Sequence, residues 1–528
     1  MNVQHLKTLA GRGRISRREF IGLALASGMT LTAAQTLFAN VARAEPKKGG
    51  LFRLALGSGS TTDTLDPANI PDTYNQVVAW ASLRSSLTEV TADGKVVPDL
   101  AESFESSPDA KTWTFKLRKG AEFHNGKTVE AADVVASFEH HRGEGSNSAA
   151  KPLLADLAEI KADGKEIVVF QLKSGNADFP FVVYDFHLPI MPAVDGKADW
   201  QSGEGTGPYS KTSYEPGVKF AGKRFANYHG TTYFDEIEVL SVIDVAARMN
   251  ALTSGEVDYI DRVDLKTLDK LSAHPNVTIS EVAGFAHYTA PMNCTIAPFD
   301  NKDVRLAIKY AIDREQLVQK ILFGHGTPGD DNPIAKGVPF YSPPKERHVY
   351  DSEKAKFHLK KAGLDSLKVD LSASDAAFAG GVNAALLMKD AAMKAGIDIN
   401  VVREPNDAYW TNVWLKKPWC LSYWNGRSTP DPLLTTAYVT GAAWNDTFWS
   451  NARFDELLVA ARSEIDAQKR SAMYAEMQDL VAEDGGAIVL MFNNFVNAHS
   501  KKLGHPATIA PNYDVDGLKI TQRWWFES

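Results

Sequence analysis

Alternating and continuous apolar runs predict the first strands of the chain. Residues Leu51 to Leu56 form a short apolar segment ahead of the Gly-Ser tract 57–60, which predicts a strand followed by a loop. In Lys111 to Arg118 apolar residues alternate with polar ones, the period of a strand with one buried face. We expect a turn soon afterwards, at Asn125 and Gly126.

Helical spacing appears next in two places. Thr128 is a candidate N-cap, followed by Glu130 and Asp133 in the early turns of a helix whose inward face carries Val134, Val135 and Phe138. A second helix is predicted to open at Asp300, with Asp303 three residues on. Its apolar residues recur at helical spacing: Val304, Ala307, Ile308, Ala311 and Ile312.

The second half of the chain predicts a β-α-β unit. Val369 to Leu371 is typical of a strand, Ala384 to Ala395 of a helix closed by Gly396, and residues 397–401 alternate again. A long helical stretch from Phe454 to Glu483 then precedes the apolar run Ala487 to Phe492, a predicted buried strand. These patterns indicate an α/β protein.

The N-terminus has the pattern of an export signal. Arg17 and Arg18 stand in the order Ser-Arg-Arg-Glu-Phe-Ile, ahead of an apolar stretch that is too short and too polar for a stable membrane span. Small residues suit cleavage after Ala44, so residues 1–44 are predicted to be removed. The order resembles a twin-arginine signal, which implies the twin-arginine translocase as a partner during export. The alternative is an amphipathic helix with a chance arginine pair.

Composition then narrows the class of protein. The 528 residues are 44% hydrophobic and 23% charged, too long a chain for one core, so two or three lobes are expected. The net charge of −8, with no basic run outside the signal, makes nucleic acid an unexpected partner. No stretch after Phe38 is apolar enough to span a membrane.

Two cysteines, Cys294 and Cys420, are too few for a disulfide framework. Both sit beside apolar or aromatic residues, which favours buried strand cysteines. A single disulfide between them is the alternative, and their separation in space would decide. No cysteine lies near the predicted cleavage site, so a lipid-anchored form has no acceptor.

Four stretches resemble the dipeptide, oligopeptide and nickel branch of the extracytoplasmic solute-binding proteins of ABC importers (family 5), and the resemblance covers essentially the whole mature chain. Their order and spacing carry the resemblance more than any one of them does. The first comprises Leu100–Phe104, Trp113–Gly120, Phe123–Gly126, Asp133–Val134 and Ser137; the second is Gly205–Tyr209; the third runs from Asn293 through Pro298–Arg305 to Ala311–Arg314; and the fourth, which is looser, is Trp424–Pro432.

The resemblance implies a periplasmic-binding-protein-like fold of two α/β lobes with a hinge. Lobe I would comprise residues 45–289 and 493–528, enlarged by a subdomain at about 85–225, and lobe II residues 290–492. Closure of the lobes on a ligand would be the recognition event. The implied function is capture of a peptide or peptide-like solute in the periplasm of a Gram-negative bacterium, as a monomer, and delivery to the membrane permease.

One departure from the family concerns the ligand's charge. In the dipeptide and oligopeptide members, an aspartate three residues after the tryptophan of the fourth stretch pairs with the ligand's ammonium group, and here that position is Arg427. A guanidinium suits a carboxylate and would repel an amine. We therefore expect an anionic or N-blocked, opine-like ligand. Alternatively, Arg427 pairs inside the protein, with Asp431 as the candidate partner.

Other candidate ligand-binding residues surround this position or face it from lobe I. The family resemblance favours Trp424, while the aromatic residues Trp414 and Trp419 nearby could equally form core. In lobe I, Asp72 could accept a ligand ammonium, although a solvated loop aspartate is the alternative. The full set of predicted ligand-binding residues is Arg427, Trp424, Asn425, Tyr423, Trp410, Asp431, Asp72, Thr73 and Tyr74.

No motif predicts a metal, a cofactor or catalysis. His140 and His141 are adjacent, so on a helix they point apart, and no CxxC or HExxH spacing occurs. The Gly-Ser tract 57–60 lacks the spacing of a nucleophile elbow, so a periplasmic hydrolase is a weaker alternative. A sensor that presents its ligand to a chemoreceptor is the other alternative, and the sequence does not separate it from an importer component.

Overall fold

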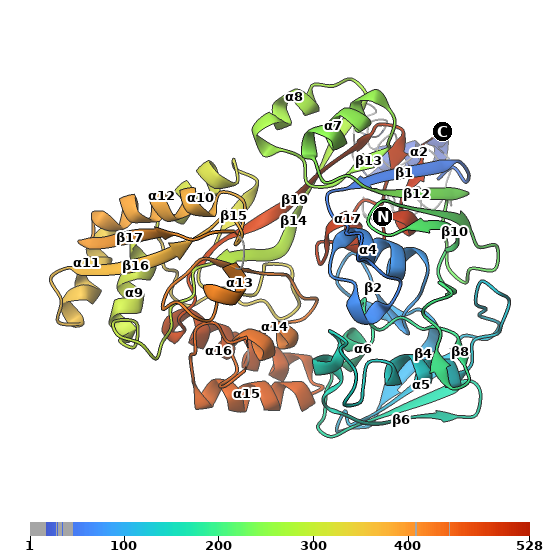
Figure 1. Cartoon of the computed structure of the whole chain (residues 1–528), viewed down its shortest axis with the longest axis horizontal. Coiled ribbons are helices and arrows are strands. Elements are labelled where there is room, and N and C mark those ends of the chain that lie inside the picture. Colours follow the sequence, from blue (N-terminus) through green and yellow to red (C-terminus); the bar gives the residue numbers. More distant parts are fainter. Residues whose placement is uncertain are drawn as a thin grey trace.

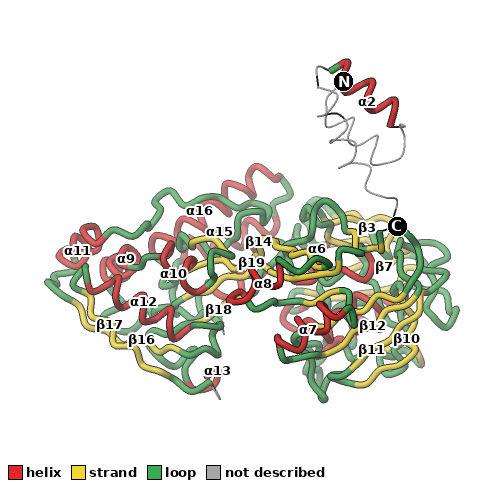
Figure 2. Tube along the Cα trace, turned by 90° about the horizontal axis from the view of Figure 1, so that it is seen from above, coloured by secondary structure: helices red, strands yellow, loops and turns green. Residues whose placement is uncertain are grey.

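The computed structural model describes residues 17–27, 29, 34, 46–406, 409–442 and 444–527. Within these ranges the chain forms two lobes joined by two long strands, β14 (Val277–Thr289) and β19 (Val489–Ser500), which run antiparallel through the middle of the molecule (Figure 1). The predicted cleavage site after Ala44 lies outside the described residues. Helix α2 (Arg17–Ala26) stands apart from the two lobes in Figure 2.

Lobe I is built on one sheet that continues into lobe II. Leu51–Leu56 forms β1 as predicted, and Phe52, Leu54 and Leu56 lie in the core. The sheet has the order β10-β11-β12-β1-β13-β19-β14-β18, with β15 paired to β19. The further strands are β10 (Tyr209–Glu215), β11 (Lys219–Arg224), β12 (Glu236–Ser241), β13 (Tyr259–Ile260), β15 (Gly326–Pro328) and β18 (Ser422–Trp424).

Short helical segments cover this sheet in lobe I. The helix α7 ends on a glycine with left-handed backbone, Gly255, as helices commonly do. The C-terminal segment returns to lobe I, where the side chain of Trp524 is buried in its core. The elements are α4 (Thr73–Gln76), α7 (Val245–Ser254), α8 (Leu268–Ser272), α17 (Asp514–Gly517), α18 (Ile520–Arg523), β20 (Leu503–Gly504) and β21 (Trp525–Phe526).

A separate four-stranded sheet, in the order β4-β5-β7-β6, forms a subdomain of lobe I with its own core. Its strand β5 confirms the predicted alternation, since Trp113, Phe115 and Leu117 are buried. The elements of this part are β2 (Thr88–Val90), β3 (Val96–Pro98), β4 (Ala101–Ser106), β5 (Thr112–Leu117), α5 (Ala131–Glu139), β6 (Leu157–Asp163), β7 (Ile167–Leu172), α6 (Phe179–Val182), β8 (Ala193–Val194) and β9 (Lys197–Ala198).

Lobe II contains the predicted β-α-β unit, in which β16 and β17 pair in parallel on either side of α12 in the chain. The alternating residues Val369, Leu371, Ile397 and Ile399 are all buried in its core. The elements of lobe II are α9 (Lys302–Ala311), α10 (Arg314–Ile321), α11 (Ser352–Lys361), β16 (Leu367–Ala373), α12 (Gly381–Met393), β17 (Ile397–Arg403), α13 (Tyr409–Asn412), α14 (Pro430–Ala437), α15 (Ala452–Ser463) and α16 (Ala467–Asp484).

Three local predictions were wrong. The N-cap of α5 is Glu130 rather than Thr128, because Glu130 and Asp133 form a reciprocal capping box while Thr128 forms an isolated backbone bridge with Glu122. The N-cap of α9 is Asn301, not Asp300. The long helical stretch from Phe454 divides into α15 and α16, because Asp466 caps a new helix through the backbone N–H groups of residues 468 and 469.

The cysteine prediction was correct in part. Both thiols are free, so the single disulfide is absent. Cys420 is buried next to β16, but Cys294 is only partly buried and lies in a turn rather than a strand.

Candidate functional site

The loop after β18 places Arg427 between the lobes. This loop packs against β14, where a Cβ atom on Gly426 would lie 2.4 Å from Cβ of Phe285, so only glycine permits the close approach. The following helix α14 begins at Pro430, a residue that suits the first helical position. The guanidinium of Arg427 donates to the carbonyls of Asn425 and Gly426 at 3.2 and 2.9 Å.

Two groups of lobe I lie near this guanidinium. Burial raises the pKa of Asp185, but the charge and hydrogen bonds of His187 and the charge of Arg427 outweigh burial and lower it overall. The carboxylate of Asp185 and Nδ1 of His187 are hydrogen-bonded at 2.7 Å. Burial likewise raises the pKa of Tyr513, which the charge of Arg427 counteracts. Among the described residues, Arg427 itself has no ion-pair partner within 4.0 Å.

Asp431 does not neutralise Arg427. Its carboxylate accepts a hydrogen bond of 2.7 Å from Nε of Arg462 and one of 3.1 Å from the hydroxyl of Thr435. These contacts hold α14 against α15, and the side chain of Asp431 is buried. The alternative in which Asp431 pairs with Arg427 is therefore not the arrangement observed.

The residues of lobe I that were predicted to contact ligand have contacts inside the protein. Asp72 is half-buried, and its carboxylate caps α4 by accepting from the backbone N–H of Asn75 at 3.0 Å. The hydroxyl of Thr73 accepts from Arg262 at 2.9 Å. Tyr74 was expected to contact ligand, but its ring is fully buried in the core of lobe I.

Five aromatic side chains of lobe II pack as one cluster. Trp410 meets Trp414 and Tyr423 edge-on, at ring-centroid distances of 5.9 and 5.4 Å, and Trp444 packs against both Trp414 and Trp424. The exposed members are Trp410, Tyr423 and Trp444 at 39%, 40% and 52%, whereas Trp424 is only 6% exposed. Trp424 thus belongs mainly to the core, contrary to its expected role as the leading pocket residue.

A buried carboxylate orients the inner part of this cluster. One oxygen of Asp446 accepts from the indole N–H of Trp414 at 3.0 Å and from that of Trp424 at 3.3 Å. Burial raises the pKa of Asp446 to about 7, although the two indole hydrogen bonds lower it. Trp419 is also core, and its indole donates to the carbonyl of Ala290 at 3.2 Å.

Several residues near the predicted site were not predicted from the sequence. Strand pairing sets Tyr288 of β14 beside Tyr423, and Tyr288 stacks on Phe378 at 4.2 Å. The charge of Arg262, a residue of lobe I, lowers the pKa of Tyr288, although burial raises that pKa overall. In the sequence, the order Asp185-Phe186-His187 mixes charged and aromatic residues. This is the signal that could have identified the residues of lobe I near the site.

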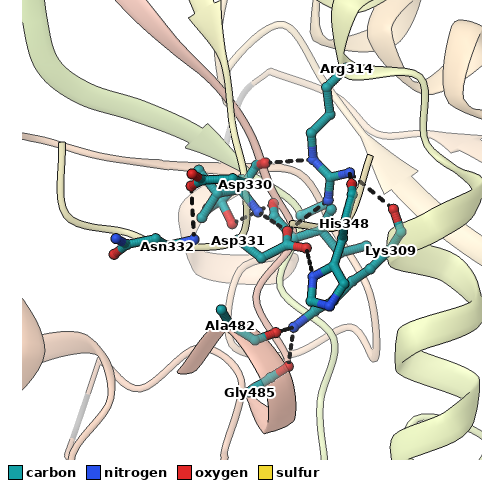
Figure 3. A network of polar contacts seen from close by, with 12 residues as sticks. Lys309, Arg314, Asp330, Asp331, Asn332, His348, Ala482 and Gly485 are labelled. Carbon is teal, nitrogen blue, oxygen red and sulfur yellow. Dashed lines mark hydrogen bonds and ion pairs between the residues drawn. The ribbon is translucent and has the colours of Figure 1, made fainter. Parts of the chain in front are cut away.

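A further group of buried charges belongs to the framework of lobe II (Figure 3). Lys309 donates to the carbonyls of Ala482 and Gly485 at 2.6 and 2.9 Å, at the end of α16. Asp331 lies between Arg314 at 2.7 Å and His348 at 2.8 Å. Burial raises the pKa of Asp331, but the charge of Arg314 and the hydrogen bond of His348 prevail and lower it to about 2. The positive charges of Arg314 and Lys309 therefore compensate the buried carboxylate of Asp331 within lobe II.

Other features of the described residues add no second candidate. A cavity of about 300 Å³ in lobe I is lined by residues outside the predicted set, among them Asp63, Trp200, Lys211 and Tyr214. The described part of the chain contains no cluster of three His, Cys, Asp or Glu side chains suited to a metal ion. It also has no helix that is both long and apolar enough to cross a membrane.

Two α/β lobes joined by the long strands β14 and β19, with Arg427 of one lobe close to Asp185 and Tyr513 of the other, have the architecture of a two-lobed binding protein. Residues 95–446 match the bacterial extracellular solute-binding proteins, family 5. The chain belongs to this family. Its α/β fold class, its family and its solute-binding role in ABC import, as predicted from the sequence, are confirmed.

Three relatives are informative. The glutathione-binding protein GsiB of Salmonella choleraesuis is 27% identical over 471 residues, 84% of this chain and 90% of GsiB. The structure of AgaA from A. tumefaciens in complex with agropinic acid is 26% identical, with a TM-score of 0.73, and the match covers 91% of this chain and 99% of AgaA. The structure of the Helicobacter pylori protein DppA with the peptide STSA has a TM-score of 0.74 at 23% identity and the same coverage.

Proposed function

We propose that the mature chain captures a small solute that bears a carboxylate or another anion, holds it between the lobes against Arg427, and delivers it to the permease of an ABC importer. The observation that carries this proposal is the state of Arg427, a cation that faces Asp185 and Tyr513 of the other lobe and has no ion-pair partner among the described residues. A guanidinium binds carboxylates through two parallel hydrogen bonds.

The relatives favour a peptide-like or opine-like solute. AgaA, whose structure holds agropinic acid, and GsiB, which is named for glutathione, both match most of this chain. The exposed rings of Trp410, Tyr423 and Trp444 would supply flat apolar contact area beside the charged group. An opine-like or N-blocked amino-acid conjugate combines these properties, since it presents an anion without the free α-amine of an ordinary peptide.

The experiment that tests the proposal is mass spectrometry of solute released by denaturing protein purified from its native host. An anionic conjugate is the expected result, and its affinity should then be measured by titration calorimetry. Ordinary peptides with free α-amines as the bound species would contradict the anion at Arg427 while leaving the solute-binding role intact. Thermal-shift screening supports the search, since a bound solute stabilises the fold by mass action.

The same proposal includes export to the periplasm of a Gram-negative bacterium by the twin-arginine translocase, and action there as a monomer. Arg17 and Arg18 open helix α2, and cleavage after Ala44 would release the two lobes. We expect N-terminal sequencing of the periplasmic protein to begin at Glu45. Replacing both arginines by lysine should retain the precursor in the cytoplasm, and normal export of that variant would contradict this route.

A further inference from the structure

The lobes touch at a second place, away from the strands that join them. The loop before α6 in lobe I meets α15 and α16 of lobe II, at the lower edge of the view in Figure 1. There the backbone N–H of Ala177 donates to the carbonyl of Arg462 at 2.6 Å. Asp178 and Arg470 form an ion pair of 2.7 Å, and their side chains are only 3% and 8% exposed.

The side chain of Asp178 is committed to the opposite lobe. Among the described residues its only side-chain partners are Arg470 and, through a long hydrogen bond of 3.5 Å, the hydroxyl of Tyr474, both on α16. Burial raises the pKa of Asp178, and the charge of Arg470 counteracts this. The cation of Arg470 offsets the free-energy cost of burying the carboxylate of Asp178. This ion pair forms only when the two lobes are in contact.

Arg470, in contrast, is held in place by its own lobe. Its Nε donates to the carbonyl of Ala461 at 3.1 Å, and its guanidinium lies over the rings of Phe340 and Tyr474 at 4.8 and 5.6 Å. Lobe II therefore presents a preformed cation to which the carboxylate of lobe I docks. The neighbouring pair Asp431–Arg462 completes the charged groups that face Asp178, since Asp431 acts on its pKa and Arg462 supplies the acceptor carbonyl for Ala177.

We propose that the Asp178–Arg470 contact is a latch that sets the population of the closed lobes and thereby the affinity for the solute, without touching the solute. The apparent dissociation constant of a protein that binds only when closed is its intrinsic value divided by the closed fraction. The Asp178–Arg470 contact and a solute bound at Arg427 both stabilise the closed arrangement of the same two lobes. Loss of the latch therefore lowers the affinity for every solute by the same factor. This inference rests on the two-lobed binding fold and not on the charge of the solute.

The test uses the mature protein without solute. The amide of Ala177 reports on the latch directly, because its hydrogen bond crosses between the lobes, and small-angle X-ray scattering reports the overall opening. For Asp178→Asn we expect hydrogen exchange in the segment 174–178 to become at least 10-fold faster and the radius of gyration to increase. Glu476→Gln is the matched control, since it breaks an exposed ion pair with Arg453 that lies within lobe II.

Arg470→Gln, which changes the other lobe, guards against a folding defect in the first variant. It should produce the same opening, and the double variant should open no further than either single one, because both remove one contact. Exchange and radius equal to those of the wild type in Asp178→Asn and Arg470→Gln, or effects that simply add in the double variant, would overturn the latch. Either result leaves the proposal for Arg427 untouched, since that residue is unchanged in all of these proteins.

Discussion

The carboxylate of Asp431 lies 2.7 Å from Nε of Arg462. Asp431 is the acidic residue closest in sequence to Arg427. Its ion pair with Arg462 joins α14 to α15 in lobe II. Among the described residues, Arg427 has two carbonyls of its own loop as hydrogen-bond acceptors and no ion-pair partner, so its guanidinium remains available to an anion between the lobes.

Replacing Arg427 by glutamine should weaken binding of the native anionic solute by about 10- to 150-fold, because a hydrogen bond to a charged group contributes about 1.5 to 3 kcal/mol. The unfolding free energy should change little, since the acceptors of this side chain among the described residues are two carbonyls of its own loop. Titration calorimetry with the solute released from the wild-type protein measures the effect. Arg453→Gln, which removes an exposed cation elsewhere in lobe II, is the control. Equal affinities in the two variants would contradict a solute contact at Arg427.

The tryptophans of lobe II should separate into two functional groups. Trp424→Ala should lower the free energy of unfolding by about 3 to 5 kcal/mol, since it empties a large volume in the core. Trp444→Ala should cost less than about 1 kcal/mol because the ring is 52% exposed. Urea denaturation measures both values, and calorimetry should show that loss of Trp444 weakens solute binding. A Trp424→Ala protein as stable as the wild type would contradict the core assignment.

Periodic patterns made much of the fold predictable from the sequence. The strand Thr112–Leu117 and the pair β16 and β17 follow from local alternation of apolar residues, which requires no knowledge of distant neighbours. Helix starts were less predictable, because Thr128, a preferred cap residue, forms a backbone bridge with Glu122, and α5 begins instead at Glu130 through its reciprocal contact with Asp133.

The site was predictable only where a single residue departs from a family pattern, as Arg427 does. The burial of Trp424 depends on Asp446, which lies 22 residues away in sequence. The contact between Asp178 and Arg470 joins two lobes, and no local pattern encodes such a pairing. Long-range contacts of this kind decide which aromatic or charged residues remain available to a ligand.

Asp446→Asn should stabilise the protein at alkaline pH. Burial raises the pKa of Asp446 from 3.8 to about 7, so the folded state penalises its ionisation, and stability is lost as pH rises from about 4 to about 7. Asparagine cannot ionise and still offers an oxygen to the two indoles. The gain in unfolding free energy at pH 8 should reach a few kcal/mol, at most about 4, and vanish near pH 4.

Denaturant unfolding at a series of pH values measures this gain. Asp390→Asn, a change at an exposed position of α12, is the control for the loss of one negative charge. If Asp446→Asn and Asp390→Asn showed the same pH dependence, the raised pKa at Asp446 would be wrong.

His287→Leu should reduce the sensitivity of the fold to acid. The imidazole of His287 is fully buried on β14 beside Phe492, and neither ring nitrogen has a hydrogen-bond partner among the described groups. Burial alone lowers its pKa from 6.5 to about 3. Between these values the unfolded chain binds the proton and the folded chain does not, so stability present above pH 6.5 is lost as the pH falls toward 3.

Leucine removes both the buried nitrogens and the titration. Near pH 7.5 the variant should be at least as stable as the wild type, because no hydrogen bond is lost. At pH 5 its advantage should grow by about 2 kcal/mol, the linkage expected for 1.5 pH units. His274→Leu, a change at a half-buried histidine of lobe I, is the control for the loss of one imidazole. Because burial also lowers the pKa of His141 and His499, the remaining acid sensitivity should persist, and parallel stability curves for wild type and His287→Leu would refute the assignment to His287.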